Sequence, residues 1–177
     1  LIHRQSQAIG IPLVQYTVPA NGDSYEQRLK RAVSALKREG VQSMVFGDIY
    51  LQEHRDWIER VCGEMRITPV MPLWKVEPQQ VLREFIAAGF ESIVVSARAD
   101  VFGQEWLGRS LDYRFLSELT KLCQERDVDI CGEHGEYHTL VVDGPLFRQR
   151  LQLVSGVREQ RDGYWFLGLT RSFLVGK

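Results

Sequence analysis

The sequence is organised around one stretch, Cys131-Gly132-Glu133-His134-Gly135-Glu136-Tyr137-His138-Thr139-Leu140-Val141-Val142-Asp143-Gly144-Pro145-Leu146-Phe147. Between Glu133 and Asp143 it holds two glutamates, two of the four histidines of the chain, a tyrosine and an aspartate. Buried strands are usually apolar, and a charged side chain buried without a partner costs free energy. The stretch therefore predicts a cleft wall or a loop that contacts a ligand, with glycines that let backbone amides approach it closely.

Glu133 and Glu136 are the candidate catalytic residues of this stretch. A carboxylate beside a nucleotide holds Mg²⁺, orients an amine or accepts a proton. The composition alone leaves a second interpretation equally open, in which both glutamates belong to a solvated acidic loop.

His134, Glu136 and His138 alternate along the chain in a pattern that suggests a metal site. In an extended strand the three side chains would share one face. A rise of about 3.3 Å per residue, however, separates positions 134 and 138 by about 13 Å. Three ligands spaced in this way do not reach one ion, so we predict no metal centre and interpret His138 as a substrate-contacting or hydrogen-bonding group.

Upstream of this stretch, short apolar runs alternate with amphipathic helical patterns. We expect helices over residues 2–9, 25–39, 50–65, 77–89 and 112–126. We expect strands over residues 11–18, 41–46, 67–71, 91–96 and 128–131. Strands that alternate with helices of this length predict right-handed crossovers, and hence an α/β fold with a mostly parallel sheet.

Polar residues follow three of the expected strands, at Gly47-Asp48, Ser96-Ala97-Arg98 and Cys131-Gly132-Glu133. In a parallel sheet, ligands bind outside the carboxyl ends of the strands. We therefore expect these three segments to meet at one crevice. An alternative role for Asp48 is to cap the helix that follows it.

Two arginines, Arg98 and Arg109, flank an irregular segment that contains Gly103 and Gly108. An arginine binds phosphate or carboxylate groups with two parallel hydrogen bonds, so both are candidates for clamping a substrate. Equally open is a structural role, in which either arginine pairs with Asp100 or Asp112.

After Pro145 the pattern changes from alternating helices and strands to strands alone. Residues 150–157 and 164–173 have strand character around Gln160-Arg161-Asp162-Gly163, and Asp-Gly between two such runs is a strong hairpin signal. We expect residues 148–177 to form an antiparallel hairpin packed on an α/β domain of residues 1–147.

The composition restricts the class of protein. A chain of 177 residues with 44% hydrophobic residues buries a sizeable core. A formal charge of −1 argues against a general nucleic-acid binder. Three cysteines without Cys-x-x-Cys spacing argue against disulfides and structural zinc, and no apolar run reaches the roughly 18 residues of a membrane span. We expect a cytoplasmic protein that does not bind membranes.

Three further motifs accompany the stretch: Gly47-Asp48-Ile49 followed by Gln52-Glu53-His54-Arg55, then Pro72-Leu73-Trp74, then Trp106-Leu107-Gly108-Arg109. In this order, over residues 5–147, they resemble the diphthine-ammonia ligase family of adenine-nucleotide alpha hydrolase-like ATP pyrophosphatases. The resemblance implies a nucleotide alpha-hydrolase (Rossmann-like) fold with ATP and Mg²⁺ as cofactors. It also implies a ligase that adenylates a small-molecule or protein-borne carboxylate with loss of pyrophosphate, before ammonia or an amine displaces AMP. A homodimer is compatible with it.

The resemblance also implies roles for individual residues. Glu133 and Glu136 would be catalytic, and Gly47 and Asp48 would border the nucleotide. The residues assigned to the substrate would be Tyr137, His138, Thr139, Arg98 and Arg109.

The chain departs from the family pattern in two places. The Ser-Gly-Gly-Lys-Asp-Ser phosphate-binding loop is not in the sequence, and we expect it to be encoded upstream of Leu1. His134 and His138 stand where the diphthamide enzymes usually carry Gly and Glu, which resembles a bacterial branch with a role such as cobamide salvage. The alternative function is a noncatalytic nucleotide- or metabolite-binding protein that uses the same crevice.

Overall fold

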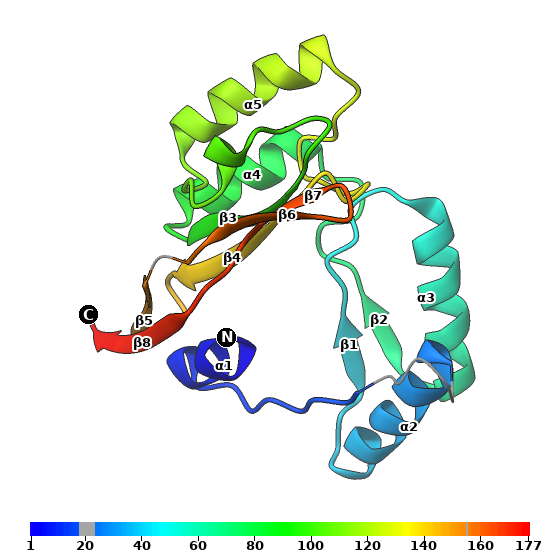
Figure 1. Cartoon of the computed structure of the whole chain (residues 1–177). Coiled ribbons are helices and arrows are strands. Elements are labelled where there is room, and N and C mark those ends of the chain that lie inside the picture. The colour runs from blue at the N-terminus through cyan, green and yellow to red at the C-terminus, as the bar shows by residue number, and fades with distance from the viewer. Residues whose placement is uncertain (18–23, 155) are drawn as a thin grey trace. The chain divides into compact units, whose positions relative to one another are not determined.

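The computed structural model describes residues 1–17, 24–154 and 156–177 of the chain (Figure 1). The chain divides into two compact units. Unit 1 comprises Leu1–Leu13 together with Glu77–Lys177, and unit 2 comprises Val14–Val76. The predicted boundary at residue 147 falls within unit 1, between two of its strands.

Unit 2 is a small α/β unit whose two strands are parallel. Strands β1 (Ser43–Val45) and β2 (Thr68–Val70) pair in parallel, and helix α3 (Gln52–Met65) connects them. Helix α2 (Tyr25–Arg38) begins at a capping box in which Ser24 and Gln27 satisfy each other's backbone N–H groups. The core of this unit is made by Val33, Ile58, Cys62 and Ile67. The predicted helices and the strands near residues 43 and 68 are confirmed here.

Unit 1 contains a four-stranded sheet in the order β4-β3-β7-β6, and all of its pairings are antiparallel. The strands are β3 (Glu91–Arg98), β4 (Tyr137–Asp143), β6 (Arg158–Arg161) and β7 (Tyr164–Leu167). The mixed α/β class is confirmed, but the expectation of a mostly parallel sheet is wrong for this larger sheet.

Two helices cover one face of this sheet, α4 (Pro78–Ala87) and α5 (Tyr113–Glu125) (Figure 1). Between β3 and α5 the chain forms a short 3₁₀ helix, η1 (Gln104–Trp106). The core beneath the helices is rich in aromatic rings, because Phe102, Trp106, Phe115 and Tyr137 pack edge to face.

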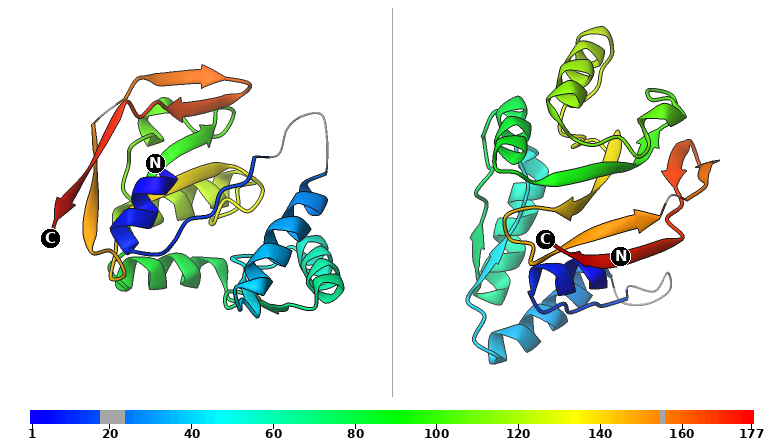
Figure 2. Two further views of the ribbon diagram at one scale, coloured as in Figure 1. Left: turned by 90° about the horizontal axis from the view of Figure 1, so that it is seen from below. Right: turned by 90° about the vertical axis from the view of Figure 1, so that its left-hand side faces the viewer.

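The remaining strands of unit 1 form a separate two-stranded sheet. Strands β5 (Gln149–Val154) and β8 (Arg171–Gly176) pair antiparallel, as Figure 2 shows, and helix α1 (Ile2–Ile9) contacts both. The β6–β7 hairpin lies between them in the sequence. Its turn residues Asp162 and Gly163 have φ values of 51° and 80°. The predicted Asp-Gly turn is therefore confirmed, but the strand before it is β6, whereas the expected strand at residues 150–157 corresponds to β5, which pairs with β8.

Two predicted strands are wrong. Residues 11–17 form no strand, and Ile11 instead donates its N–H to the carbonyl oxygen of Ser6 near the end of α1. Residues 128–131 form turns, because Asp129 accepts hydrogen bonds from the backbone that a strand would direct to a neighbour. No helix in the described ranges is both long enough and apolar enough to cross a bilayer.

The acidic side chain of Glu26 generates a testable pH dependence in unit 2. Arg60 and Lys30 donate hydrogen bonds to this carboxylate at 2.7 and 2.6 Å, and they lower its pKa from 4.5 to about 2. Because the folded pKa is depressed, this contribution to stability is present above about pH 4.5 and is lost as the pH falls toward about 2. We expect Glu26→Gln to flatten the fall of the unfolding free energy across this range.

Urea unfolding at a series of pH values measures this effect. Glu39→Gln, at the exposed end of α2, is the matched control and should keep the wild-type slope. An unchanged slope in Glu26→Gln would show that the ion pairs do not stabilise the fold.

Candidate functional site

The stretch that the sequence singled out forms a loop and then a strand. Residues 129–136, which we name the signature loop, connect the end of α5 to the start of β4. Gly132 and Gly135 have φ values of 74° and 80°, a region that side chains other than glycine rarely adopt. A Cβ atom at Gly132 would lie 2.9 Å from the carbonyl oxygen of Tyr137, so the turn requires glycine there.

Two carboxylates hold the signature loop by accepting hydrogen bonds from its backbone. Glu136 is only 2% exposed, and its two oxygens accept from the N–H groups of Asp129 (3.0 Å) and His134 (3.1 Å). Asp129 Oδ1 accepts from the N–H groups of Cys131 (2.8 Å) and Glu133 (3.0 Å). These bonds compensate the cost of burying the carboxylate of Glu136, and they satisfy backbone donors that no strand or helix would satisfy.

Tyr137 connects the signature loop to the hydrophobic core. Its hydroxyl donates to the carbonyl oxygen of Ile130 at 2.7 Å, and its ring packs against Phe102 and Phe115. Burial raises the pKa of Tyr137 well above its usual value, with nearby acidic groups adding to the effect. The hydroxyl is therefore protonated at neutral pH, and it donates its hydrogen bond to the backbone of the signature loop.

The signature loop and helix α4 enclose a pocket of about 400 Å³, which we name the signature pocket. Four of the predicted site residues line it: Glu133, Tyr137, His138 and Thr139. Helix α4 contributes Val81, Leu82 and Phe85 to its wall. Glu136 does not line the pocket, because its carboxylate lies beneath the loop backbone.

Cys131 also lines the signature pocket, and its thiol is not a nucleophile at neutral pH. The Sγ atom donates a hydrogen bond to the carbonyl oxygen of Pro78 at 3.2 Å. Burial, aided by nearby carboxylates, raises the pKa of Cys131 to about 12. Since the thiolate is the reactive form, this residue acts as a small buried side chain.

The two predicted arginines lie outside the signature pocket, paired with acidic residues. Arg98 donates its backbone N–H to Glu136 at 2.8 Å, because the end of β3 lies beside the start of antiparallel β4. Its guanidinium donates to Asp100 at 2.8 Å. Arg109 pairs with Glu118 at 2.7 Å and stacks over the ring of Trp106 at 4.4 Å. Arg98 therefore has the partner that the pairing alternative named, whereas Arg109 pairs with Glu118 instead of Asp100 or Asp112.

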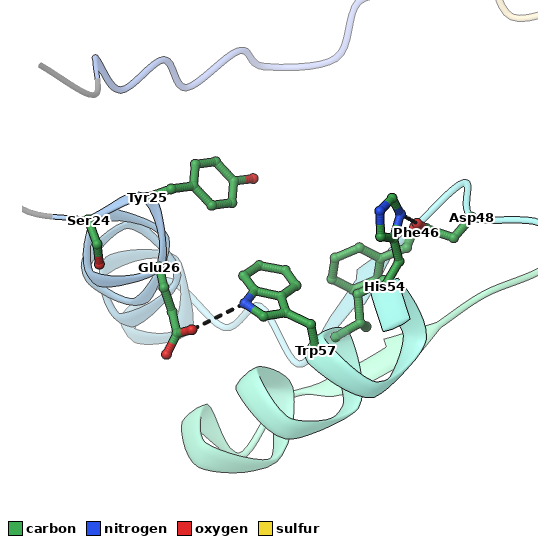
Figure 3. Close-up of a pocket in the computed structure, with 8 residues that line it drawn as sticks. Ser24, Tyr25, Glu26, Phe46, Asp48, His54 and Trp57 are labelled. Atoms are coloured by element: carbon green, nitrogen blue, oxygen red, sulfur yellow. Dashed lines mark hydrogen bonds and ion pairs between the residues drawn. The ribbon is translucent and has the colours of Figure 1, made fainter. Parts of the chain in front are cut away.

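Unit 2 contains a second pocket, of about 590 Å³, at the carboxyl end of β1. Tyr25 and Trp57 on one side face Phe46 and the pair of Asp48 and His54 on the other (Figure 3). The rings of Tyr25 and Trp57 are 6.0 Å apart and tilted by 32°. We name this cavity the aromatic pocket.

Asp48 lines the aromatic pocket and does not cap a helix. Its Oδ1 atom lies 3.0 Å from Nδ1 of His54. The N-cap of helix α3 is Leu51, whose side chain provides no capping hydrogen bond, so the capping alternative for Asp48 is wrong. Gly47 precedes it at the end of the strand, with open space where a side chain would project.

Comparison with known protein families identifies the chain. Residues 1–69 match the model of the diphthamide synthase N-terminal domain, and residues 77–175 match the model of the diphthamide synthase C-terminal domain. The chain belongs to the diphthamide synthase family. The boundary between the two family models coincides with the start of the larger segment of unit 1 at Glu77.

Curated relatives of this diphthamide synthase family member carry the name diphthine–ammonia ligase. The protein from Danio rerio is 31% identical over 164 residues, which cover 82% of this chain and 62% of the relative. The protein from Homo sapiens is 27% identical over 161 residues, covering 82% of this chain and 59% of the relative. The chain thus spans about three fifths of the length of these relatives.

The sequence analysis assigned no site role to several residues of the aromatic pocket and the signature loop. It placed Tyr25 and Trp57 in helices, and the structure shows both in the lining of the aromatic pocket. Asp129 was passed over as part of a strand. The sequence feature that could have identified its role is its position two residues before Cys131. An Asp side chain often accepts a hydrogen bond from the backbone N–H two residues further along the chain.

ATP, which the family implies, fits the described residues only in part. The aromatic rings of Tyr25 and Trp57 suit a planar base. Among the described residues that line the aromatic pocket there is no lysine or arginine, while Glu26 and Asp48 are acidic, so this pocket does not suit the triphosphate. Mg²⁺ prefers oxygen ligands, which both carboxylates of this pocket could provide. Glu26 already accepts hydrogen bonds from Trp57, Lys30 and Arg60, so Asp48 is the better candidate ligand.

Replacing the two glutamates of the signature loop should change the stability of the fold by unequal amounts. Glu136→Gln puts an amide NH₂ group against one of the two backbone donors, so we expect the free energy of unfolding to fall by about 2–3 kcal/mol. Glu133→Gln changes a side chain in the pocket wall and should alter stability by less than about 1 kcal/mol.

Denaturant unfolding of the two variants and the wild type measures this difference. Asp129→Ala removes the oxygen that accepts from Cys131 and Glu133, so it serves as a second probe of the same arrangement and should also lower the stability. Equal stability of Glu136→Gln and the wild type would contradict the structural role of this carboxylate.

Proposed function

We propose that the chain is part of an ATP-dependent carbon–nitrogen ligase. In the reaction, ATP adenylates a substrate carboxylate with release of pyrophosphate, and ammonia or an amine then displaces AMP to form an amide. Family membership supports this proposal, since the relatives are named for the ligation of ammonia. The observation that carries it is the fixed signature loop, which presents Glu133, His138 and Thr139 to one pocket.

The aromatic pocket would hold the base of ATP. Tyr25 and Trp57 would stack on the adenine ring, with Gly47 and Asp48 beside the nucleotide. Asp48 would hold Mg²⁺, and the ion when bound would neutralise charge on the phosphates. The described lining residues offer no positive charge, so the phosphates need donors from elsewhere in the protein.

The signature pocket would hold the group that reacts with the activated carboxylate. Glu133 would orient it and accept its proton, with His138 and Thr139 as hydrogen-bonding partners. Glu136 would act through the loop that it holds rather than on the substrate. Arg98 and Arg109 stay predictions as substrate ligands, because each would first have to leave Asp100 or Glu118.

A noncatalytic binding protein is the second candidate. One observation favours it: the aromatic pocket, as far as its described lining goes, lacks a cation for the phosphates. A Ser-Gly-Gly-Lys-Asp-Ser loop in the complete reading frame would favour the ligase instead, since transfer to a carboxylate requires donors for the developing charge on pyrophosphate. A homodimer also stays a prediction.

ATP binding tests the role of the aromatic pocket. Each of Tyr25→Ala and Trp57→Ala should weaken the binding of ATP with Mg²⁺ by roughly tenfold, because stacking on an aromatic ring is lost. Isothermal titration into the product of the complete reading frame measures these affinities. Tyr113→Ala, at the exposed start of α5 in unit 1, is the control and should leave the affinity unchanged.

The reaction products decide between the two functions. With ATP, Mg²⁺, ammonium and diphthine, the substrate in the name of the relatives, the ligase forms AMP and pyrophosphate. ADP and phosphate would contradict the proposed chemistry. If ATP does not bind at all, the binding-protein alternative becomes the better account.

A further inference from the structure

Two connections join the sheets of unit 1, and they touch each other. One runs from β5 to β6 through Gly156, and the other runs from β7 to β8 through Gly168 (Figure 2). Gly168 donates its backbone N–H to the carbonyl oxygen of Val157 at 2.8 Å. A Cβ atom at Gly156 would overlap the carbonyl oxygen of Gly168, so this close approach requires glycine.

A cavity of about 570 Å³ lies beside this contact, and we name it the aliphatic pocket. Its volume falls within the range of roughly 300–1,000 Å³ that is typical of small-molecule sites. None of its described lining residues belongs to the signature pocket or to the aromatic pocket. Most of its wall consists of five aliphatic side chains, which are Ile93, Leu107, Leu153, Leu167 and Leu169.

Arg158 of β6 is the one charged residue among the described residues that line the aliphatic pocket. Its Nη2 atom donates to the carbonyl oxygen of Leu107 at 3.3 Å. Arg98, Arg109 and Arg150 each pair with a carboxylate. Arg158, in contrast, forms no ion pair with any residue in the described ranges. Since a guanidinium has five N–H donors, most of them stay available to an anion in this pocket.

These features favour a ligand with an apolar body and one anionic end. Each methylene group that the aliphatic wall buries raises affinity by about fourfold. A carboxylate accepts two parallel N–H bonds from a guanidinium, and the exposure of Arg158 lets it keep part of its hydration. Arg158 would repel a cationic end, and the single negative charge of a carboxylate matches the single cation of the described lining.

We propose that the aliphatic pocket binds a medium-chain monocarboxylate, with its carboxylate at Arg158 and its alkyl chain among the five aliphatic side chains. This site is additional to the two pockets of the proposed ligase. The inference does not rest on the ligase, because its lining residues belong to neither of those pockets.

Titration of simple ions into the full chain, without ATP, tests the site. The probes are sodium acetate, butyrate, hexanoate and octanoate, with octylammonium chloride as the comparison of opposite charge. We expect affinity to rise by up to about fourfold for each added methylene group. Octylammonium should bind at least roughly tenfold more weakly than octanoate, because it lacks the charge-assisted hydrogen bonds. Isothermal titration measures the affinities, and NMR shifts of the backbone amides of Gly108 and Gly168 locate the ligand.

Two variants test the role of the guanidinium. Arg158→Gln should weaken octanoate binding by roughly tenfold or more, because the cation is lost. Arg38→Gln, at the exposed end of α2 in unit 2, is the matched control and should bind as the wild type does. Circular dichroism checks that both variants are folded, and the chain-length series requires no variant.

Several results would overturn the carboxylate site. They are octylammonium binding as tightly as octanoate, an affinity that does not depend on chain length, an unchanged affinity in Arg158→Gln, and NMR shifts confined to the signature loop. Octanoate binding at Arg158 in a protein that forms no AMP from ATP would support the site and remove the ligase. AMP formation without any octanoate binding would support the ligase and remove the site.

Discussion

The signature loop depends on two carboxylates that accept hydrogen bonds from the backbone. Asp129 and Glu136 together satisfy the N–H groups of four residues over six positions of the chain. A buried N–H group without a partner costs about as much as a lost hydrogen bond, so this loop would not stay ordered without them. Gly132 and Gly135 supply the backbone angles that bring the donors to the two acceptors.

The two glutamates that the sequence presents as a pair have different structural roles. Glu136 is buried and bound to the backbone, whereas Glu133 contributes its own N–H group to the loop and its side chain to the pocket wall. Of the two carboxylates, the one that lines the signature pocket is therefore Glu133. Tyr137 adds rigidity, since its hydroxyl bonds the loop and its ring lies in the aromatic core.

Local patterns predicted most of the fold. The helices follow from apolar periodicity with caps, as at Ser24 and Asp112, and the β6–β7 turn follows from Asp162-Gly163. The direction of the main sheet did not follow, because the expected strand at residues 128–131 is absent and the strand that pairs with β3 there is the antiparallel β4. Their apolar character suggests a strand, but the side chain of Asp129 competes for the backbone donors and turns the chain back.

Part of the candidate site was predictable, and part was not. The sequence brought Glu133, His138 and Thr139 together because they lie on one loop and strand. It expected Ser96-Ala97-Arg98 to meet Cys131-Gly132-Glu133 at the ends of parallel strands, whereas the structure brings the backbone of Arg98 to Glu136 through antiparallel pairing. The pairing of Arg98 with Asp100 was one of the two alternatives from the sequence. The pairing of Arg109 with Glu118 and the wall that α4 contributes are tertiary contacts that no local pattern records.

Hydrogen–deuterium exchange at the backbone amides of Asp129, Cys131, Glu133 and His134 tests the central claim most directly. These residues lie outside helices and strands, so their amides are slow to exchange only if the two carboxylates hold them. The account predicts protection at all four amides that approaches the protection of β4. Exchange at the rate of an open loop would contradict it.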